Sequence, residues 1–159
     1  MITFVNDDLL NTSHKYICHQ VNCKGVMGSG VAKQIRDKWP EVYDKYKEFC
    51  KGNIIYNNPT SDLLGKIQVY PINENQKIVN MFAQNDYGRN RRYTSYDAFW
   101  VCLGEILKIT KPGDNIAFPF GIGCGLGGAN WEVICKMIEI ALKDRNVFIY
   151  CKCKIIFDK

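Results

Sequence analysis

Short apolar runs alternate along this chain with longer segments of helical periodicity, and that alternation restricts the folds open to it. The apolar runs are predicted to be strands, at residues 2–5, 16–21, 66–72, 77–84, 115–120 and 147–151, with residues 154–157 as an extension of the last. The periodic segments are predicted to be helices, at residues 30–39, 40–52, 95–110 and 131–142, and residues 57–65 to be a loop. This order predicts an α/β domain of three layers, with a largely buried mixed sheet between helices.

The length and composition suit one domain over residues 1–159. The chain has 159 residues, of which 47% are hydrophobic, enough for a single core. It shows neither a secretory leader pattern nor an apolar run long enough to cross a bilayer, so we expect a soluble, cytoplasmic protein without membrane contact. The formal charge of +5 permits an anionic ligand, but the basic residues are dispersed, so nucleic acid is not an expected partner.

The cysteines form no metal-binding or disulfide pattern. There are eight of them, no C-x-x-C motif occurs, and the two histidines stand at no ligand-like spacing from any of them. Cys151 and Cys153 would share one face of an alternating strand, with a metal half-site as the alternative interpretation. We predict reduced, mostly buried thiols, and we expect no metal and no cofactor.

Two glycine-rich stretches, "GVMGSG" at residues 25–30 and "FGIGCGLGG" at residues 120–128, point to the ligand. Neither matches a dinucleotide or P-loop fingerprint, and either one alone could be a structural turn. Each, however, follows a predicted strand and leads into a predicted helix, and ligands of open α/β sheets bind outside the carboxyl ends of strands. Two such loops can supply backbone amides and two helix dipoles from opposite sides, which suggests a diphosphate.

Four stretches of the chain resemble, in order, the conserved blocks of the macrodomain family, which binds ADP-ribose. They are "ITFVNDDLL", "HQVNCKGVMGSGVAKQIRDKWP", "VNMFAQNDYGRNRRYTSYDAF" and "AFPFGIGCGLGGANW". The resemblance is to the branch with the yeast-type ADP-ribose-1″-phosphate phosphatases, the phage and bacterial ADP-ribose-1″-phosphate processing proteins and the terminal ADP-ribose protein glycohydrolases. It implies a three-layer α/β/α macrodomain with ADP-ribose or a derivative as its ligand.

The resemblance also implies which residues hold the ligand. Asp8 should accept a hydrogen bond from the adenine amino group beside the Leu9 backbone, although Asp8 could equally cap a short helix. Asn22 should lie near the distal ribose, and the two glycine loops should hold the diphosphate. The full implied binding set is Asp8, Leu9, Asn22, Gly25, Val26, Met27, Gly28, Ser29, Gly30, Val31, Gln84, Tyr87, Gly121, Ile122, Gly123, Cys124, Gly125 and Leu126.

The residues of the glycohydrolase branch are missing from their expected positions. Gln84 stands where that branch has an attacking lysine, and Gly127 stands where it has an assisting aspartate. Glutamine cannot form a Schiff base and glycine cannot act as a base, so we expect that mechanism to be absent.

The resemblance to the phosphatase branch makes His19 and Asp86 the candidate catalytic residues. His19 could protonate a leaving ribose oxygen or deprotonate a water, or it could be a structural histidine in an apolar strand. Asp86 could assist at the distal ribose, or it could simply form a loop turn. The basic residues at 89–92 could contact an additional phosphate or remain solvated.

The sequence thus predicts a metal-independent phosphatase that removes the 1″-phosphate from ADP-ribose-1″-phosphate, acting as a monomer. The alternatives are a non-catalytic reader of ADP-ribose or ADP-ribosylated protein, and an ADP-ribosyl hydrolase that uses other residues. Tyr87 could either contact the ligand or be simply exposed. Trp131 and the remaining aromatic residues are assigned to the core.

Overall fold

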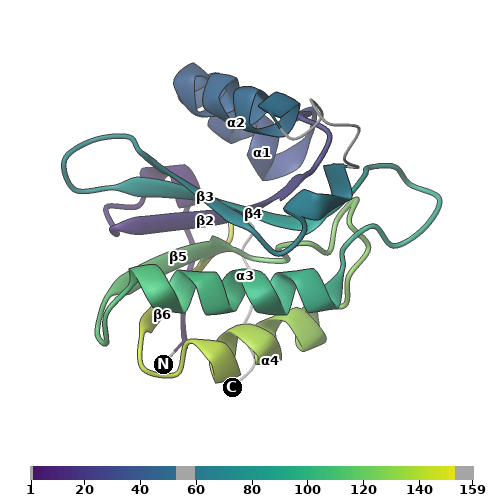
Figure 1. Cartoon of the computed structure of the whole chain (residues 1–159). Helices are drawn as coiled ribbons and strands as arrows, with labels where there is room; N and C mark the ends of the chain where they lie inside the picture. Colours follow the sequence, from purple (N-terminus) through teal and green to yellow (C-terminus); the bar gives the residue numbers. More distant parts are fainter. Residues whose placement is uncertain (1, 53–59, 153–159) are drawn as a thin grey trace.

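The computed structural model describes residues 2–52 and 60–152, which form a mixed sheet between two pairs of helices (Figure 1). The strands are β1 (Ile2–Val5), β2 (Tyr16–Asn22), β3 (Ile67–Pro71), β4 (Lys77–Gln84), β5 (Asn115–Pro119) and β6 (Asn146–Tyr150). The helices are α1 (Gly30–Lys38), α2 (Pro40–Gly52), α3 (Tyr96–Ile109) and α4 (Trp131–Ala141), with short 3-10 helices η1 (Leu9–Asn11) and η2 (Thr60–Leu63). The predicted α/β class is confirmed.

The sheet has the strand order β1-β6-β5-β2-β4-β3. All neighbouring strands run parallel except β3, which pairs antiparallel with β4 at one edge. Parallel strands need crossover connections, and the helices that supply them bury both faces of the sheet. The near-continuous burial of β4, six of whose eight residues are buried, follows from this arrangement.

Apolar side chains of the two sheet faces pack against different helices. Toward α3 and α4 lies the larger cluster, which includes Cys18, Met81, Phe99 and Ile138. Toward α1 and α2 lie two smaller clusters, one of which places Phe82 against Tyr46. Each fully buried aromatic or branched side chain contributes on the order of 1.5–3 kcal/mol. The two-sided core therefore fixes β2 and β4 firmly in the middle of the domain.

Some details of the sequence prediction are wrong. The predicted loop at residues 57–65 contains η2, and three aromatic residues assigned to the core are exposed: Phe4 (38%), Trp100 (46%) and Phe120 (36%). Trp100 belongs to the apolar stripe of α3, but that stripe is wider than the surface the helix buries. The predicted strand extension at residues 154–157 lies outside the described residues.

The cysteine prediction is confirmed for the seven cysteines that the structure describes, because all of them are free thiols. Four are buried, and burial raises the pKa of Cys23 and Cys102 to about 12. Buried thiols of this kind are packing residues rather than nucleophiles. Cys153 lies outside the described residues, so the prediction that it shares a strand face with Cys151 stays a prediction.

Candidate functional site

The two glycine loops leave the sheet at the same edge. β2 and β5 are parallel neighbours, so the loop after β2 (residues 23–29) and the loop after β5 (residues 120–130) emerge side by side. The first leads to α1 on one face of the sheet, and the second leads to α4 on the other face (Figure 1). Adjacent strands whose connections go to opposite faces form a topological switch point, where α/β proteins hold their ligands.

A cavity of about 750 Å³ lies between these loops, a volume within the usual range for small-molecule sites. Most of the predicted binding residues line it: Asn22, Val26, Gly28, Ser29, Gly30, Val31, Gln84, Tyr87, Gly121, Ile122, Gly123, Gly125 and Leu126. His19 also lines it. The predicted residues that do not line it are Asp8, Leu9, Gly25, Met27, Asp86 and Cys124. The structure therefore brings both glycine loops together and leaves the predicted adenine end outside the cavity.

The Asn22 side chain holds the first glycine loop in shape. Its Oδ1 accepts hydrogen bonds from the backbone N–H of Lys24 (3.0 Å) and Val26 (3.3 Å), and its Nδ2 donates to the Val26 carbonyl at 2.7 Å. The buried Tyr46 hydroxyl lies 2.8 Å from the same Oδ1. An amide engaged so fully acts first as a brace for the loop.

The N-terminus of α1 opens into the cavity without a side-chain cap. Ser29 occupies the N-cap position but makes no capping hydrogen bond, and the first intrahelical bond runs from Lys33 N–H to the Ser29 carbonyl. The first-turn amides of Gly30 and Val31 therefore have no helix partner. Free amides at the positive end of a helix dipole are a suitable partner for a phosphate.

The second glycine loop is closed by its own hydrogen bonds. Cys124 N–H donates to Gly121, Gly128 N–H to Gly125 and Ala129 N–H to Gly123, in each case to the backbone carbonyl at 2.8–3.1 Å. The helix that follows is capped, because Asn130 Oδ1 accepts from the N–H groups of Glu132 and Val133. The sequence predicted that both helix N-termini would be open to a ligand. Of the two, the N-terminus of α1 is uncapped and that of α4 is capped.

Gly127 is enclosed by the loop around it. Its carbonyl accepts from the N–H groups of Tyr93 and Thr94, and a β-carbon built on Gly127 would collide with Thr94 Oγ1. The same β-carbon would lie 2.5 Å from the carbonyl oxygen of Gly123. The loop in this form has no room for any side chain at residue 127, an aspartate included.

Neutral amide and hydroxyl groups form the wall between β2 and the second loop. Gln20 Nε2 donates to Gln84 Oε1 (2.7 Å) and to Thr94 Oγ1 (2.8 Å), and Thr94 in turn donates to the Gly123 carbonyl. Gln84 Nε2 donates to the Asp86 carbonyl at 2.9 Å. Both ends of the Gln84 amide are thus engaged, and the group is a positioning element with no nucleophilic atom.

His19 is buried in β2, with 1% of its surface exposed. Its Nε2 lies 2.5 Å from Asn80 Oδ1, and its Nδ1 has no partner within the described parts of the chain. Burial lowers the pKa of His19 to about 4, although the bond to Asn80 opposes that shift. The imidazole is therefore neutral near pH 7, and it is not the imidazolium acid that would protonate a leaving group.

The loop after β4 brings an arginine and a tyrosine to the cavity. Tyr87, which is 51% exposed, lines the cavity together with Arg89. The Asp86 carboxylate accepts from the Tyr87 N–H at 2.8 Å, as expected of a loop turn. The guanidinium groups of Arg91 and Arg92 lie over the rings of Tyr93 and Tyr96, so within the basic run Arg89 is the cavity residue.

Asp8 is engaged on both carboxylate oxygens. Oδ1 accepts from the Leu10 N–H at 3.0 Å and so caps η1, and Oδ2 pairs with the Lys152 ammonium at 2.9 Å. Burial raises the pKa of Asp8, but these two partners, together with the nearby charge of Lys38, outweigh it and the pKa is lowered overall. The capping role is confirmed, while the adenine contact stays a prediction.

Several lining residues escaped the sequence prediction: Gln20, Val21, Ala32, Arg89 as a lining residue, Pro119, Phe120 and Gly127. Gln20 could have been found, because it lies in the strand that leads directly into the first glycine loop. Phe120 was assigned to the core, yet it lines the cavity, where its ring lies tilted against that of Trp131 with centroids 4.7 Å apart. Trp131 itself is partly buried against the main core, as predicted.

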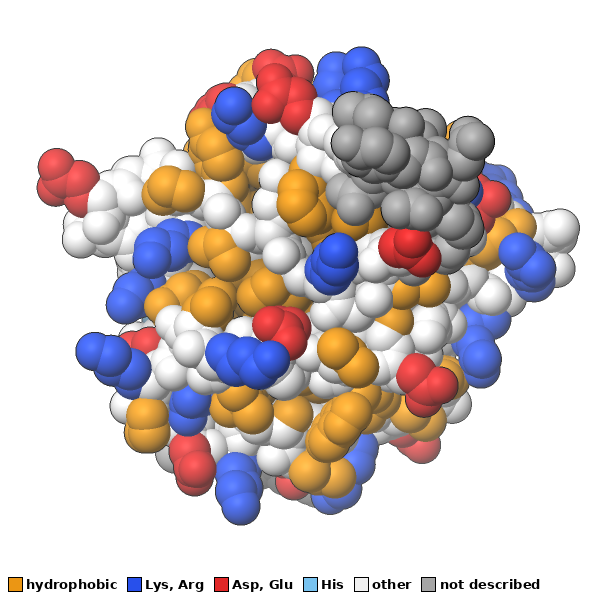
Figure 2. Space-filling view, in the orientation of Figure 1, with side chains coloured by type: hydrophobic (Ala, Val, Ile, Leu, Met, Phe, Trp, Pro, Cys, Tyr) orange, Lys and Arg blue, Asp and Glu red, His pale blue; other side chains and the backbone are white. Residues whose placement is uncertain are grey.

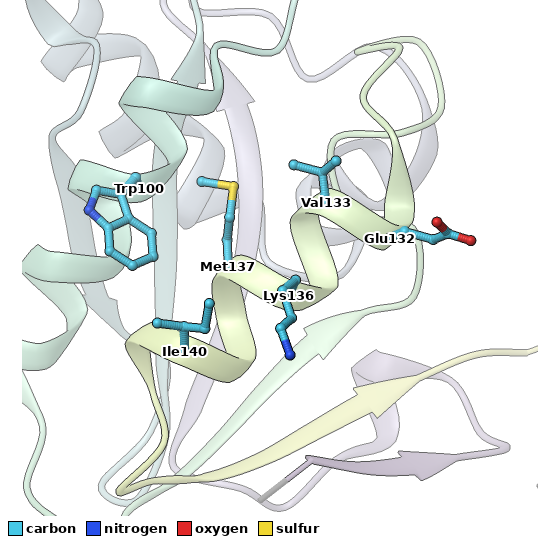
Figure 3. A pocket seen from close by; sticks show the side chains of 6 residues that line it. All are labelled: Trp100, Glu132, Val133, Lys136, Met137 and Ile140. Atoms are coloured by element: carbon cyan, nitrogen blue, oxygen red, sulfur yellow. The ribbon is translucent and has the colours of Figure 1, made fainter.

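A second hollow, which is apolar, lies between α3 and α4. Figure 3 shows Trp100 of α3 facing Met137 and Ile140 of α4, with Val133 beside them. It has a volume of about 380 Å³, and the polar residues of its lining are Glu132 and Lys136 of α4. On the face shown in Figure 2, Lys and Arg side chains are scattered among acidic ones rather than gathered in a patch. The polar cavity at the strand ends is therefore the stronger site.

Comparisons with known proteins agree with this fold. No family model matches the chain. The macrodomain of Mycobacterium tuberculosis DarG superposes with a TM-score of 0.76 at 25% identity, covering 94% of this chain and 97% of that one. The chain therefore has the macrodomain fold and has homologues among macrodomain proteins, as the sequence resemblance implied.

Two curated relatives carry different activities in their names. The DNA ADP-ribosyl glycohydrolase of Mycobacterium tuberculosis is 26% identical over 153 residues, which cover 94% of this chain and 42% of that protein. The chain thus spans less than half the length of that relative. The ADP-ribose 1″-phosphate phosphatase of Saccharomyces cerevisiae is 26% identical over 178 residues, 94% of this chain and 97% of that protein.

None of the helices within residues 2–52 and 60–152 has the length and apolar character needed to cross a membrane.

Proposed function

We propose that the cavity binds ADP-ribose and that the chain hydrolyses the 1″-phosphate of ADP-ribose-1″-phosphate. The observation that carries the binding proposal is the uncapped N-terminus of α1, which faces a closed glycine loop across one cavity. The amides of the first loop and of α1 would hold the diphosphate, and the second loop would border the distal ribose. The homologues named for reactions of ADP-ribose support this ligand.

Arg89 and His19 are the lining residues that we propose for phosphatase chemistry. Arg89 is the cationic side chain of the lining and suits a terminal phosphate, which it would contact through two N–H groups. In the reaction, the oxygen of a water bonds to phosphorus and the bond from phosphorus to the ribose oxygen breaks. The ribose oxygen keeps the electron pair and takes up a proton, so the products are ADP-ribose and inorganic phosphate.

The second candidate function is removal of ADP-ribose from a modified partner, which the glycohydrolase relatives favour. Those relatives are named for DNA, so ADP-ribosylated DNA joins ADP-ribosylated protein as a candidate carrier. Against it stand the engaged, neutral amide of Gln84 and the absence of room for an acid at residue 127. A non-catalytic reader would share the cavity and lack turnover altogether.

A direct assay separates these functions. The protein is incubated with ADP-ribose-1″-phosphate, with ADP-ribosylated DNA and with ADP-ribosylated protein, and released phosphate and released ADP-ribose are measured. We expect phosphate from the first substrate, and a loss of that release in Arg89→Ala with ADP-ribose binding retained. Release of ADP-ribose from DNA or protein alone would establish the second function. Binding of ADP-ribose without any product would establish a reader.

A further inference from the structure

Three polar side chains form a row across neighbouring strands, starting at the cavity wall. His19 of β2 is the register partner of Asn80 of β4, and Asn80 is the register partner of Gln68 of β3. Side chains of register partners point to the same face of a sheet, so the three stand in one line. α2 packs on that face, and Gln68 Nε2 donates to the Lys45 backbone carbonyl at 3.1 Å.

The direction of every hydrogen bond in this row follows from the carbonyl at its end. A backbone carbonyl only accepts, so Gln68 must present its NH₂ group to Lys45 and its Oε1 to Asn80. Asn80 Nδ2 then donates to that Oε1 at 3.2 Å, which turns Asn80 Oδ1 toward the histidine. Because Oδ1 only accepts, Nε2 of His19 must carry the proton.

We infer that Asn80 and Gln68 are positioning residues that hold His19 as the neutral Nε2–H tautomer, with Nδ1 as a hydrogen-bond acceptor. Asn80 is completely buried and His19 is 1% exposed, so water does not compete for these bonds. Nδ1 is the ring nitrogen without a partner among the described residues. The lowered pKa of His19 agrees with a ring that stays neutral near pH 7.

This inference decides between the two chemical roles open to His19, and in that respect it rests on the proposed function. A neutral ring whose Nε2–H is already bonded to Asn80 cannot protonate the leaving ribose oxygen. Its Nδ1 lone pair can accept a hydrogen bond from a water or a ribose hydroxyl group. The role that remains is that of a hydrogen-bond acceptor, and because Nδ1 is itself buried, only a water or hydroxyl group that enters the space beside the ring can use it.

Nitrogen chemical shifts of the imidazole test the tautomer in the free protein, independently of any activity. The chain contains two histidines, so the His14→Gln variant leaves the His19 ring as the single imidazole signal. We expect Nε2 at the shift of a protonated nitrogen and Nδ1 at the shift of an unprotonated one at pH 7. A protonated Nδ1, or an imidazolium ring, would overturn the inference.

Matched variants test whether Asn80 and Gln68 set this state. Asn80→Ala and Gln68→Ala should each yield a mixture of tautomers. Gln68→Glu should keep the Nε2–H form, because its carboxylate still accepts from Asn80 Nδ2. Neither residue lines the cavity, so Asn80→Ala should lower kcat for phosphate release at least about tenfold with KM little changed.

The outcomes separate this inference from the proposed function. If the wild-type ring has the expected tautomer but no phosphate is released from ADP-ribose-1″-phosphate, the phosphatase proposal fails and the positioning role of Asn80 stands. If phosphate is released but Asn80→Ala and Gln68→Ala keep the wild-type tautomer and kcat, the positioning role is wrong and the phosphatase proposal stands.

Discussion

The two glycine loops line one cavity but are stabilised in opposite ways. The first, at residues 25–31, is held from outside by the Asn22 amide and the Tyr46 hydroxyl, and it leaves the first turn of α1 uncapped. The second, at residues 121–128, is held by its own backbone hydrogen bonds and by Thr94, and the helix beyond it is capped by Asn130. An open loop presents amides to an anion, whereas a closed loop presents a fixed surface. We therefore propose that the diphosphate binds chiefly at the first loop.

The largest expected effect comes from removing the brace of the first loop. Asn22→Ala loses the acceptor of two backbone amides and the donor to the Val26 carbonyl, at about 1 kcal/mol for each lost bond, so we expect about 3 kcal/mol lower unfolding free energy. ADP-ribose binding should weaken with it. Chemical denaturation and calorimetry measure the two effects. Tyr46→Phe, the control, should cost about 1 kcal/mol, and an equal cost for both variants would contradict the bracing role.

The strands that lead into the two loops differ in their response to acid. β2 contains His19, whereas β5, with the sequence NIAFP, has no ionisable side chain. The pKa of His19 falls from 6.5 to about 4 on folding. Between these two pH values the unfolded chain binds a proton at this residue and the folded chain does not. Stability should therefore fall by about 3 kcal/mol between pH 6.5 and pH 4 on account of this group.

Denaturation of wild type and His19→Gln at pH 7 and pH 4.5 isolates that contribution, since losses from other groups cancel in the difference. Burial also lowers the pKa of His14, which acts in the same direction. His14→Gln is the matched control and should keep most of the acid sensitivity. Equal acid sensitivity in wild type and His19→Gln would show that the ring is not held neutral.

The closed character of the second loop can be tested with two neighbouring glycines. In Gly127→Ala the new methyl group meets Thr94 Oγ1 and the Gly123 carbonyl, so we expect a loss of about 2 kcal/mol in unfolding free energy. In Gly125→Ala the methyl group meets no protein atom within 4 Å, so stability should stay within about 0.5 kcal/mol of wild type. Thermal and chemical unfolding compare the pair directly. Equal stability of the two variants would mean that the loop rearranges freely.

The smallest expected stability effects distinguish the two helix N-termini. Asn130→Ala removes the α4 cap and should cost about 1 kcal/mol while leaving ADP-ribose affinity unchanged. Ser29→Asp should do the reverse: its carboxylate can cap α1 but occupies the amides meant for the diphosphate and repels it. Ser29→Ala should change stability little. If Ser29→Asp bound ADP-ribose as tightly as wild type, the proposed binding of the diphosphate at the N-terminus of α1 would be wrong.

The sequence predicted the features that depend on local pattern. Periodicity identified the strands and helices, and the position of each glycine loop between a strand and a helix placed both loops at one edge of the sheet. No local sequence pattern, however, tells whether a glycine loop leaves the helix after it uncapped or is closed by its own hydrogen bonds. That difference depends on contacts with residues far away in sequence, such as Tyr46 for the first loop and Thr94 for the second.

The same limit explains the residues that were missed or misassigned. The row of His19, Asn80 and Gln68 depends on the register of three strands, which composition does not reveal. Trp100 was placed in the core because it follows the apolar stripe of α3, but α4 covers less of that stripe than its width suggests. The capping interpretation of Asp8, by contrast, required only local chemistry and is confirmed.

The most direct test of the central claim is an amide NMR titration of the protein with ADP-ribose, with ADP as the comparison ligand. We predict shifts of the backbone amides at residues 28–32 for both ligands, and additional shifts at residues 121–127 for ADP-ribose. The amides beside the apolar hollow, at Trp100, Val133 and Ile140, should stay unchanged. Shifts confined to that hollow, or none at the first loop at saturating ADP-ribose, would contradict the assignment of the diphosphate to the open loop.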